Sequence, residues 1–231
     1  IKKIKKNKKI FKKTYSNTLV EKLPYTLTAG QQEIVKEIDF DLSSSQRMFR
    51  ILQGDVGSGK TIISILAALN TIEAGYQCGL MAPTSILAEQ HFLLFKELIK
   101  KTNLNINYSL LTGKVDTKDR KRILEDLKNN KINLLIGTHA LFQKTIKFNK
   151  LGLVIIDEQH KFGVKQRINF AKKGGSNCDV LLMSATPIPR TMMMSIYGDM
   201  DTSRLMEKPI QRKKITTLSK PENKINDLWP F

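Results

Sequence analysis

The fold of this 231-residue chain is decided by Gly54-Asp55-Val56-Gly57-Ser58-Gly59-Lys60-Thr61. The stretch follows an apolar run, Met48–Gln53, which has the length and composition of a buried strand. It leads into a pattern of helical period, Lys60–Glu73. A glycine-rich turn between a strand and a helix is the context that a phosphate-binding loop requires. We therefore predict a nucleotide-binding P-loop domain.

The residue types in this loop suit a nucleoside triphosphate. Glycines let the backbone curl around a phosphate with its N–H groups pointing inward, and the helix N-terminus adds the positive end of its dipole. Lys60 is expected to reach the β and γ phosphates, and the Thr61 hydroxyl to ligate Mg²⁺. The predicted nucleotide-binding residues of the loop are Gly54, Asp55, Val56, Gly57, Ser58, Gly59, Lys60 and Thr61.

A second motif follows the apolar run Leu153–Ile156, where the chain continues with Asp157 and Glu158. A carboxylate at the carboxyl end of a strand beside the loop strand can hold Mg²⁺, and its neighbour can orient or deprotonate the attacking water. We assign Asp157 to the metal and Glu158 to the water. The predicted catalytic residues are thus Lys60, Asp157 and Glu158.

Short apolar runs alternate with amphipathic stretches from Tyr25 onward. The predicted strands are Met48–Gln53, Gly79–Ala82, Ile106–Leu111, Asn133–Gly137, Leu153–Asp157 and Val180–Ser184, and the predicted helices are Gly30–Ile38, Lys60–Glu73, Ile86–Lys100, Thr117–Asn129 and Pro189–Tyr197. Several strands are apolar on both faces, which predicts an α/β, RecA-like domain with a mostly parallel sheet and helices on both faces. No further strand-helix unit is expected after Asp199.

Charge and composition restrict the class of protein further. The formal net charge is +18, and eight of the first 13 residues are lysine. Such a charge favours a polyanionic partner, with nucleic acid the obvious candidate, although lysine-rich composition alone is the competing explanation.

There is no apolar run of membrane-spanning length and no signal-peptide pattern, so we expect a cytoplasmic protein without a membrane partner. Cys78 and Cys178 lack CxxC partners and indicate neither a disulfide framework nor a zinc site.

Three smaller features leave alternatives open. The amide of Gln31 offers a donor and an acceptor to adenine, but a polar residue at a helix start explains it equally well. Ser184-Ala185-Thr186 either links the nucleotide site to a second surface or forms a strand-end turn. His91 lies on a helical stretch and is predicted to be structural, whereas His160 gains a role from its place beside the acidic pair.

Taken in order, the motifs resemble those of superfamily 2 helicases, and most closely those of bacterial helicases that act on branched DNA. The matching stretches are Leu23–Thr28, Gln53–Thr61, Ala82–His91, Leu111–Gly113, Gly137–Leu141, Asp157–Arg167 and Ser184–Thr191. Transcription-repair coupling translocases share several of them, but Gln159 and Ser58 favour the branched-DNA helicases. Lys161 stands where this family more often has arginine.

The resemblance implies ATP and Mg²⁺ as cofactors, an adenine contact for Gln31, and DNA as the partner. It implies contacts to the DNA backbone for Pro83, Thr84, Thr112, Gly113, Thr138 and His139, which would track a strand without reading its bases. It also implies that hydrolysis is coupled to movement by Gln159, His160, Ser184 and Thr186.

The same resemblance divides the chain into three parts. Residues 1–23 resemble a basic linker from an upstream wedge region, 24–205 the first RecA-like domain, and 206–231 a linker toward a second RecA-like lobe. Because the wedge and the second lobe are absent and the chain begins with Ile1, we expect a fragment that binds ATP and hydrolyses it weakly. The alternatives are a domain of a coupling translocase and a truncated DNA-binding remnant without catalysis.

Overall fold

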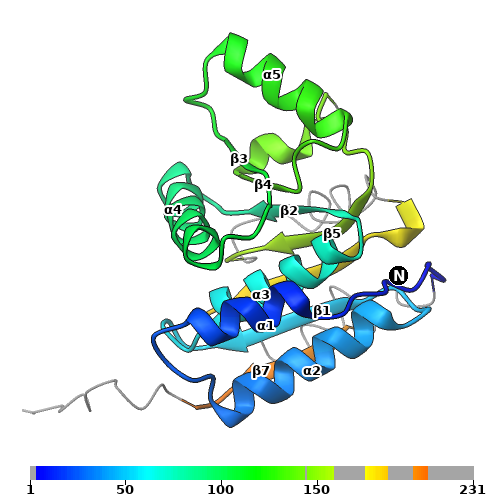
Figure 1. Ribbon diagram of the computed structural model, residues 1–231, viewed down its shortest axis with the longest axis vertical. Coiled ribbons are helices and arrows are strands. Elements are labelled where there is room, and N and C mark those ends of the chain that lie inside the picture. The colour runs from blue at the N-terminus through cyan, green and yellow to red at the C-terminus, as the bar shows by residue number, and fades with distance from the viewer. Residues whose placement is uncertain (1–3, 144, 159–174, 187–199, 208–231) are drawn as a thin grey trace, which may run out of the picture.

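The computed structural model describes residues 4–143, 145–158, 175–186 and 200–207. In these residues, seven strands form one sheet in the order β3-β4-β2-β5-β6-β1-β7, and neighbouring strands are parallel (Figure 1). The strands are β1 Phe49–Gly54, β2 Gln77–Met81, β3 Tyr108–Leu111, β4 Leu134–Gly137, β5 Leu151–Ile156, β6 Asp179–Ser184 and β7 Asp201–Leu205. The predicted parallel α/β sheet is confirmed.

The helices are α1 Thr14–Lys22, α2 Ala29–Ser43, α3 Lys60–Glu73, α4 Ser85–Thr102 and α5 Thr117–Lys128, with the short 3-10 helices η1 His139–Phe142 and η3 Gly175–Asn177. Helices α3, α4 and α5 begin and end close to the predicted residues, α2 continues beyond its predicted end at Ile38, and α1 lies in the segment expected to be a linker. The helix predicted at 189–197 lies outside the described residues. None of the described helices is long and apolar enough to cross a lipid bilayer.

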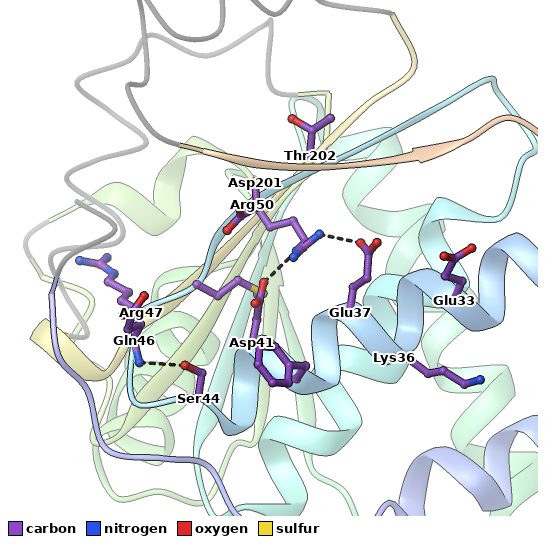
Figure 2. A pocket seen from close by; sticks show the side chains of 12 residues that line it. Glu33, Lys36, Glu37, Asp41, Ser44, Gln46, Arg47, Arg50, Asp201 and Thr202 are labelled. Atoms are coloured by element: carbon purple, nitrogen blue, oxygen red, sulfur yellow. Dashed lines mark hydrogen bonds and ion pairs between the residues drawn. The ribbon is translucent and has the colours of Figure 1, made fainter.

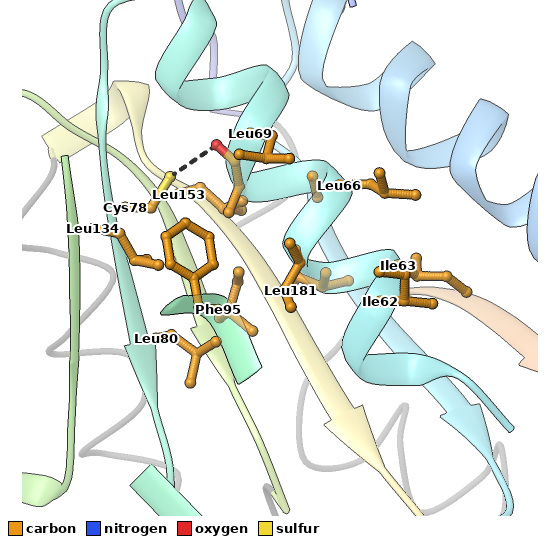
Figure 3. Close-up of a cluster of buried hydrophobic side chains, with 14 of the residues drawn as sticks. Ile62, Ile63, Leu66, Leu69, Cys78, Leu80, Phe95, Leu134, Leu153 and Leu181 are labelled. Atoms are coloured by element: carbon orange, nitrogen blue, oxygen red, sulfur yellow. Dashed lines mark hydrogen bonds between the residues drawn. The ribbon is translucent and has the colours of Figure 1, made fainter. Parts of the chain in front are cut away.

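Hydrophobic cores lie on both faces of the sheet because buried strands send alternate side chains to opposite sides. Leu153 and Ile155 of β5 join a core with residues of α1, α2, α3 and α4. Figure 3 shows Phe95 of α4 beside this sheet face, next to the helix α3. Val154 and Ile156 join a second core, to which α5 and η1 contribute. The sheet therefore lies between two hydrophobic cores, one on each face.

Two elements depart from the sequence-based expectations. Strand β7, which pairs with β1 in parallel, is not among the predicted strands. β7 is an edge strand that buries only Ser203 and Leu205 among its five residues, so its polar sequence did not resemble a strand. Helix α1, in the basic lead-in, packs on α3 and buries Leu19 completely.

The amino end of the sheet holds two buried lysines. Nζ of Lys6 lies 2.6 Å and Nζ of Lys9 2.7 Å from Oδ2 of Asp179, and all three side chains are 0% exposed. Oδ1 of Asp179 accepts a hydrogen bond from the N–H of Met48 at 2.7 Å, and both ammonium groups also donate to backbone carbonyls. Burial lowers the pKa of Lys6, and the Asp179 carboxylate partly opposes this. We call Lys6, Lys9 and Asp179 the lysine clamp.

At this end, ion pairs also join β1 to α2, and a hydrogen bond joins β1 to β7. Arg50 of β1 lies 2.6 Å from a carboxylate oxygen of Glu37 and 2.8 Å from one of Asp41, both on α2. Its guanidinium also donates to the Ser203 hydroxyl of β7 at 2.6 Å. Figure 2 shows Arg50, Glu37 and Asp41 lining a cavity of about 640 Å³ between α2 and the starts of β1 and β7. This cavity is therefore at the opposite end of β1 from the phosphate-binding loop.

Candidate nucleotide-binding site

The sheet brings the two predicted motifs to one edge. The loop Gly54–Thr61 follows β1 and Asp157 follows β5, and the carboxyl ends of parallel strands meet at the same edge of the sheet. The expectation that these two strands are neighbours is wrong, because β6 lies between them. Ser184, at the end of β6, pairs in register with Gln53 of β1. The Ser184–Thr186 segment therefore lies between the loop and the acidic pair.

The loop backbone turns tightly between β1 and α3. The N–H of Ser58 donates to the carbonyl of Asp55 at 3.1 Å. Gly57 and Gly59 have φ angles of 80° and 96°, in the left-handed region that favours glycine. Nζ of Lys60 donates to the carbonyls of Gly54 at 2.6 Å and Asp55 at 2.9 Å. The lysine ammonium thus lies against the loop that is predicted to bind phosphate.

The start of the loop leaves no room for a side chain at Gly54 and holds a buried hydroxyl that suits a phosphate group. A Cβ atom at Gly54 would lie 2.7 Å from Oγ of Ser58 and 2.8 Å from Cβ of Leu205. Oγ of Ser58 is buried, and no hydrogen-bond partner for it is found in the described structure. A phosphate oxygen is the kind of acceptor that such a hydroxyl requires. The residues present therefore suit the predicted ligand.

The acidic motif acts electrostatically on Lys60. Burial lowers the pKa of the Lys60 ammonium, and the carboxylates of Asp157, Glu158 and Asp55 partly oppose this shift, in that order. A carboxylate has this effect only when it lies near the ammonium. Lys60 and the pair Asp157–Glu158 therefore belong to one site.

Backbone bonds hold the acidic pair at the end of β5. The N–H of Asp157 donates to the carbonyl of Met81 at 2.8 Å, which joins it to the end of β2. Oδ1 of Asp157 accepts the N–H of Glu158 at 2.9 Å. Glu158 has a φ of 47°, a left-handed conformation that is uncommon for residues with a side chain and often occurs at functional sites.

His91 of α4 also belongs to this site, and the sequence did not predict its contact there. Its Nε2 lies 2.7 Å from Oδ2 of Asp157, and the two side chains are 10% and 13% exposed. A carboxylate only accepts hydrogen bonds, so Nε2 carries the hydrogen. The residues are 66 positions apart, and no spacing rule links a helical histidine to a distant strand end.

Gln31 supports the loop from α2. Thr28 and Gln31 form a capping box at the start of α2, in which the Gln31 side chain accepts the N–H of Thr28 at 3.0 Å. The Nε2 of Gln31 donates to the carbonyl of Ser58 at 2.8 Å. The side chain therefore joins the start of α2 to the phosphate-binding loop, and its contact with adenine stays a prediction.

The residues predicted to contact DNA follow β2, β3 and β4, on the other half of the same edge. Thr84 caps α4 by accepting the N–H of Leu87 at 3.2 Å. Thr112 and Thr138 are buried, whereas Gly113 and His139 are exposed and Pro83 is half-buried. Gln159 and His160, which are predicted to couple hydrolysis to movement, lie outside the described residues. The hydroxyl of Ser184 lies 3.2 Å from that of Thr186.

A comparison with protein families assigns the chain to a class. The DEAD/DEAH box helicase family model matches residues 28–195. The matched range includes both motifs of the candidate site. The chain therefore belongs to the DEAD/DEAH box helicase family.

Within this family the chain is a homologue of the ATP-dependent DNA helicase RecG, which confirms the resemblance found in the motifs. It is 49% identical to RecG of Aquifex aeolicus (strain VF5) over 199 residues, covering 86% of this chain and 25% of the relative. It is 48% identical to RecG of Bacillus subtilis (strain 168), covering 86% of this chain and 29% of the relative. The chain thus spans between a quarter and a third of these relatives.

A solved structure of RecG bound to a three-way DNA junction has the same fold. It is 39% identical to this chain, with a TM-score of 0.85, and the match covers 99% of this chain and 30% of that one. The DEAD-box helicase Mss116 bound to single-stranded RNA is 18% identical with a TM-score of 0.65, which shows similarity of fold alone. Both agree with the predicted RecA-like domain.

Proposed function

We propose that this chain is the ATP-binding motor domain of a RecG-like DNA helicase and that it binds Mg²⁺-ATP between Gly54–Thr61 and the pair Asp157–Glu158. The observation that carries the proposal is the topology of the sheet. The loop follows β1 and the acidic pair follows β5, two places away in the same parallel sheet, so both motifs lie at one edge. One triphosphate bound at this edge would contact both motifs.

The site residues have distinct roles in this proposal. Lys60 exchanges its bonds with the loop carbonyls for charge-assisted bonds to the β and γ phosphates. Thr61 and Asp157 are the protein ligands of Mg²⁺, which supplies positive charge to the phosphates when it is bound. Glu158 orients or deprotonates the attacking water.

The substrate is DNA, with a branched structure inferred from RecG. The predicted backbone contacts at Pro83, Thr84, Thr112, Gly113, Thr138 and His139 follow β2, β3 and β4, which adjoin the strands of the nucleotide site. A second RecA-like lobe is the other proposed partner. An arginine supplied from such a lobe raises phosphoryl-transfer rates by about 10³ to 10⁵, so the isolated chain hydrolyses ATP weakly.

Nucleotide binding and turnover by the purified chain test the proposal. Wild type is expected to bind ATP in the presence of Mg²⁺, and Lys60→Ala to bind it at least about tenfold more weakly, since each lost factor of ten corresponds to about 1.4 kcal/mol. Equal and negligible binding by both proteins would contradict nucleotide binding. Rapid DNA-stimulated turnover by the wild-type monomer would contradict the need for a second lobe.

A further inference from the structure

His91 makes a contact that a purely structural histidine does not require. It is buried on α4, and its Nε2 donates to Oδ2 of Asp157 at 2.7 Å. The second oxygen of Asp157, Oδ1, accepts the N–H of Glu158 at 2.9 Å. Each oxygen of the carboxylate thus accepts one hydrogen bond and keeps a lone pair for another contact. The two donors come from different elements and hold the carboxylate plane in one orientation.

From this geometry we infer that His91 is a positioning residue for Asp157 and that it sets the affinity of the site for Mg²⁺ rather than for the nucleotide itself. The inference rests on the proposed function, in which Asp157 is a magnesium ligand. It assigns a role to a residue of α4 that lies outside the phosphate-binding loop and the acidic motif.

The physical reason is the strict geometry of magnesium. Mg²⁺ demands near-octahedral coordination at about 2.0–2.1 Å, so a ligand carboxylate that rotates binds the ion more weakly. Hydrogen bonds from a second layer of residues prevent that rotation, and losing one typically lowers metal affinity about 10- to 100-fold. With Nε2 of His91 removed, Oδ2 of Asp157 would have no side-chain donor in the described part of the chain.

A structural role predicts something different. In that case the bond only joins α4 to the end of β5, and losing it lowers the stability of the fold without changing how magnesium strengthens nucleotide binding. The two roles are separated by the metal advantage, defined as the dissociation constant of a nucleotide in EDTA divided by its dissociation constant in Mg²⁺.

Two amide variants provide a matched pair that keeps a polar side chain at position 91. The amide nitrogen of His91→Gln reaches the place of Nε2, whereas that of His91→Asn is one carbon shorter and does not. Thr102→Val is the control on the same helix, because the Thr102 hydroxyl is buried and, among the described residues, bonds only to the carbonyl of Ile99 within α4. Binding is measured by the fluorescence of N-methylanthraniloyl-ATP, and folding by thermal unfolding.

His91→Asn is expected to lower the metal advantage about tenfold or more, while its affinity in EDTA stays within about twofold of wild type. His91→Gln and Thr102→Val should keep the wild-type metal advantage. An unchanged metal advantage in His91→Asn, or an equal loss in His91→Gln and His91→Asn, would overturn the inference.

The wild-type protein separates this inference from the proposed function. If it binds no nucleotide, the nucleotide site itself is refuted, and the inference is refuted with it. If it binds nucleotide equally in EDTA and in Mg²⁺, only the magnesium assignment and the role of His91 are lost. If the wild type shows a metal advantage that His91→Asn retains, the proposed function stands and the inference alone is wrong.

Discussion

The two ends of the sheet use the same kinds of charged residue in opposite ways. At the amino end, Asp179 of β6 contacts Lys6 and Lys9, and all three side chains are sealed at 0% exposure. At the carboxyl end, Lys60 lies near Asp157 and Glu158, and the Asp157 side chain remains 13% exposed. A fold depends on every member of a buried charge cluster, because removing one leaves the others unpaired, whereas charges left partly open can bind a ligand. Position in the sheet, and not residue type, separates the two uses.

The largest effect is expected at the lysine clamp. Asp179→Ala leaves two ammonium groups and the N–H of Met48 buried without their carboxylate, which should lower the free energy of unfolding by about 3–5 kcal/mol. Urea unfolding measures the loss. Glu89→Gln is the control, because it breaks an exposed pair with Lys114 and should leave the unfolding midpoint unchanged. A midpoint for Asp179→Ala close to that of the control would contradict a structural role for the clamp.

A smaller effect is expected from a comparison of two glycines, Gly59 in the nucleotide site and Gly75 outside it. Gly59 and Gly75 both have positive φ, at 96° and 81°, but a Cβ at Gly59 would collide with the Gln31 amide and one at Gly75 would meet nothing within 4 Å. Each alanine variant should lose about 1 kcal/mol of stability from backbone strain. Only Gly59→Ala should also weaken ATP binding, by about tenfold or more, a loss of about 1.4 kcal/mol.

Titration with fluorescent ATP distinguishes these two variants. Equal ATP affinity in Gly59→Ala and Gly75→Ala would mean that the closeness of Gln31 to the loop has no bearing on nucleotide binding.

Gln31→Ala should have a milder effect on the same site. It removes one hydrogen bond to Ser58 and one member of the capping box, which should cost about 1 kcal/mol of stability. If Gln31 also contacts adenine, its loss should weaken ATP binding more than GTP binding. Competition between the two nucleotides measures the difference. An equal loss for ATP and GTP would restrict Gln31 to supporting the loop.

The smallest effect is expected at Cys178, which precedes Asp179 at the buried amino end of the sheet. Burial raises the pKa of its thiol to about 12, so the thiolate is scarce at neutral pH and above. Because this folded-state pKa exceeds the ordinary 9.0, the stability that the protonated thiol contributes is complete below about pH 9 and is lost as the pH rises toward 12. A thiol reagent at pH 8 should leave folded wild type unmodified and react faster with Asp179→Ala. Rapid reaction of folded wild type at Cys178 would show that this end is open.

Features that depend on neighbouring residues in the sequence could be predicted. The P-loop motif occurs between a strand and a helix, and α3 runs over the predicted residues, Lys60–Glu73. Apolar runs predicted six of the strands in the described structure, because strands buried on both faces contain few polar residues.

Long-range packing produced the features that the sequence did not reveal. β7 has a polar sequence and is a strand because it pairs with β1. Lys6 and Lys9 belong to the lysine run that was expected to be a basic linker, yet Asp179 lies more than 160 positions away and holds them inside. His91 meets Asp157 only after α4 packs on the sheet. No periodicity or motif spacing encodes these contacts.

A double-mutant cycle on the metal advantage for ATP shows whether the loop and the acidic pair bind one magnesium-bound triphosphate. The variants are Thr61→Ala, Asp157→Asn and the two combined. Residues that share a ligand show coupling energies of about 0.5–3 kcal/mol, whereas independent residues show additive losses. We predict that the combined variant loses no more of the metal advantage than the more damaging single variant. Fully additive losses would place Thr61 and Asp157 at separate sites and exclude a shared magnesium-bound triphosphate.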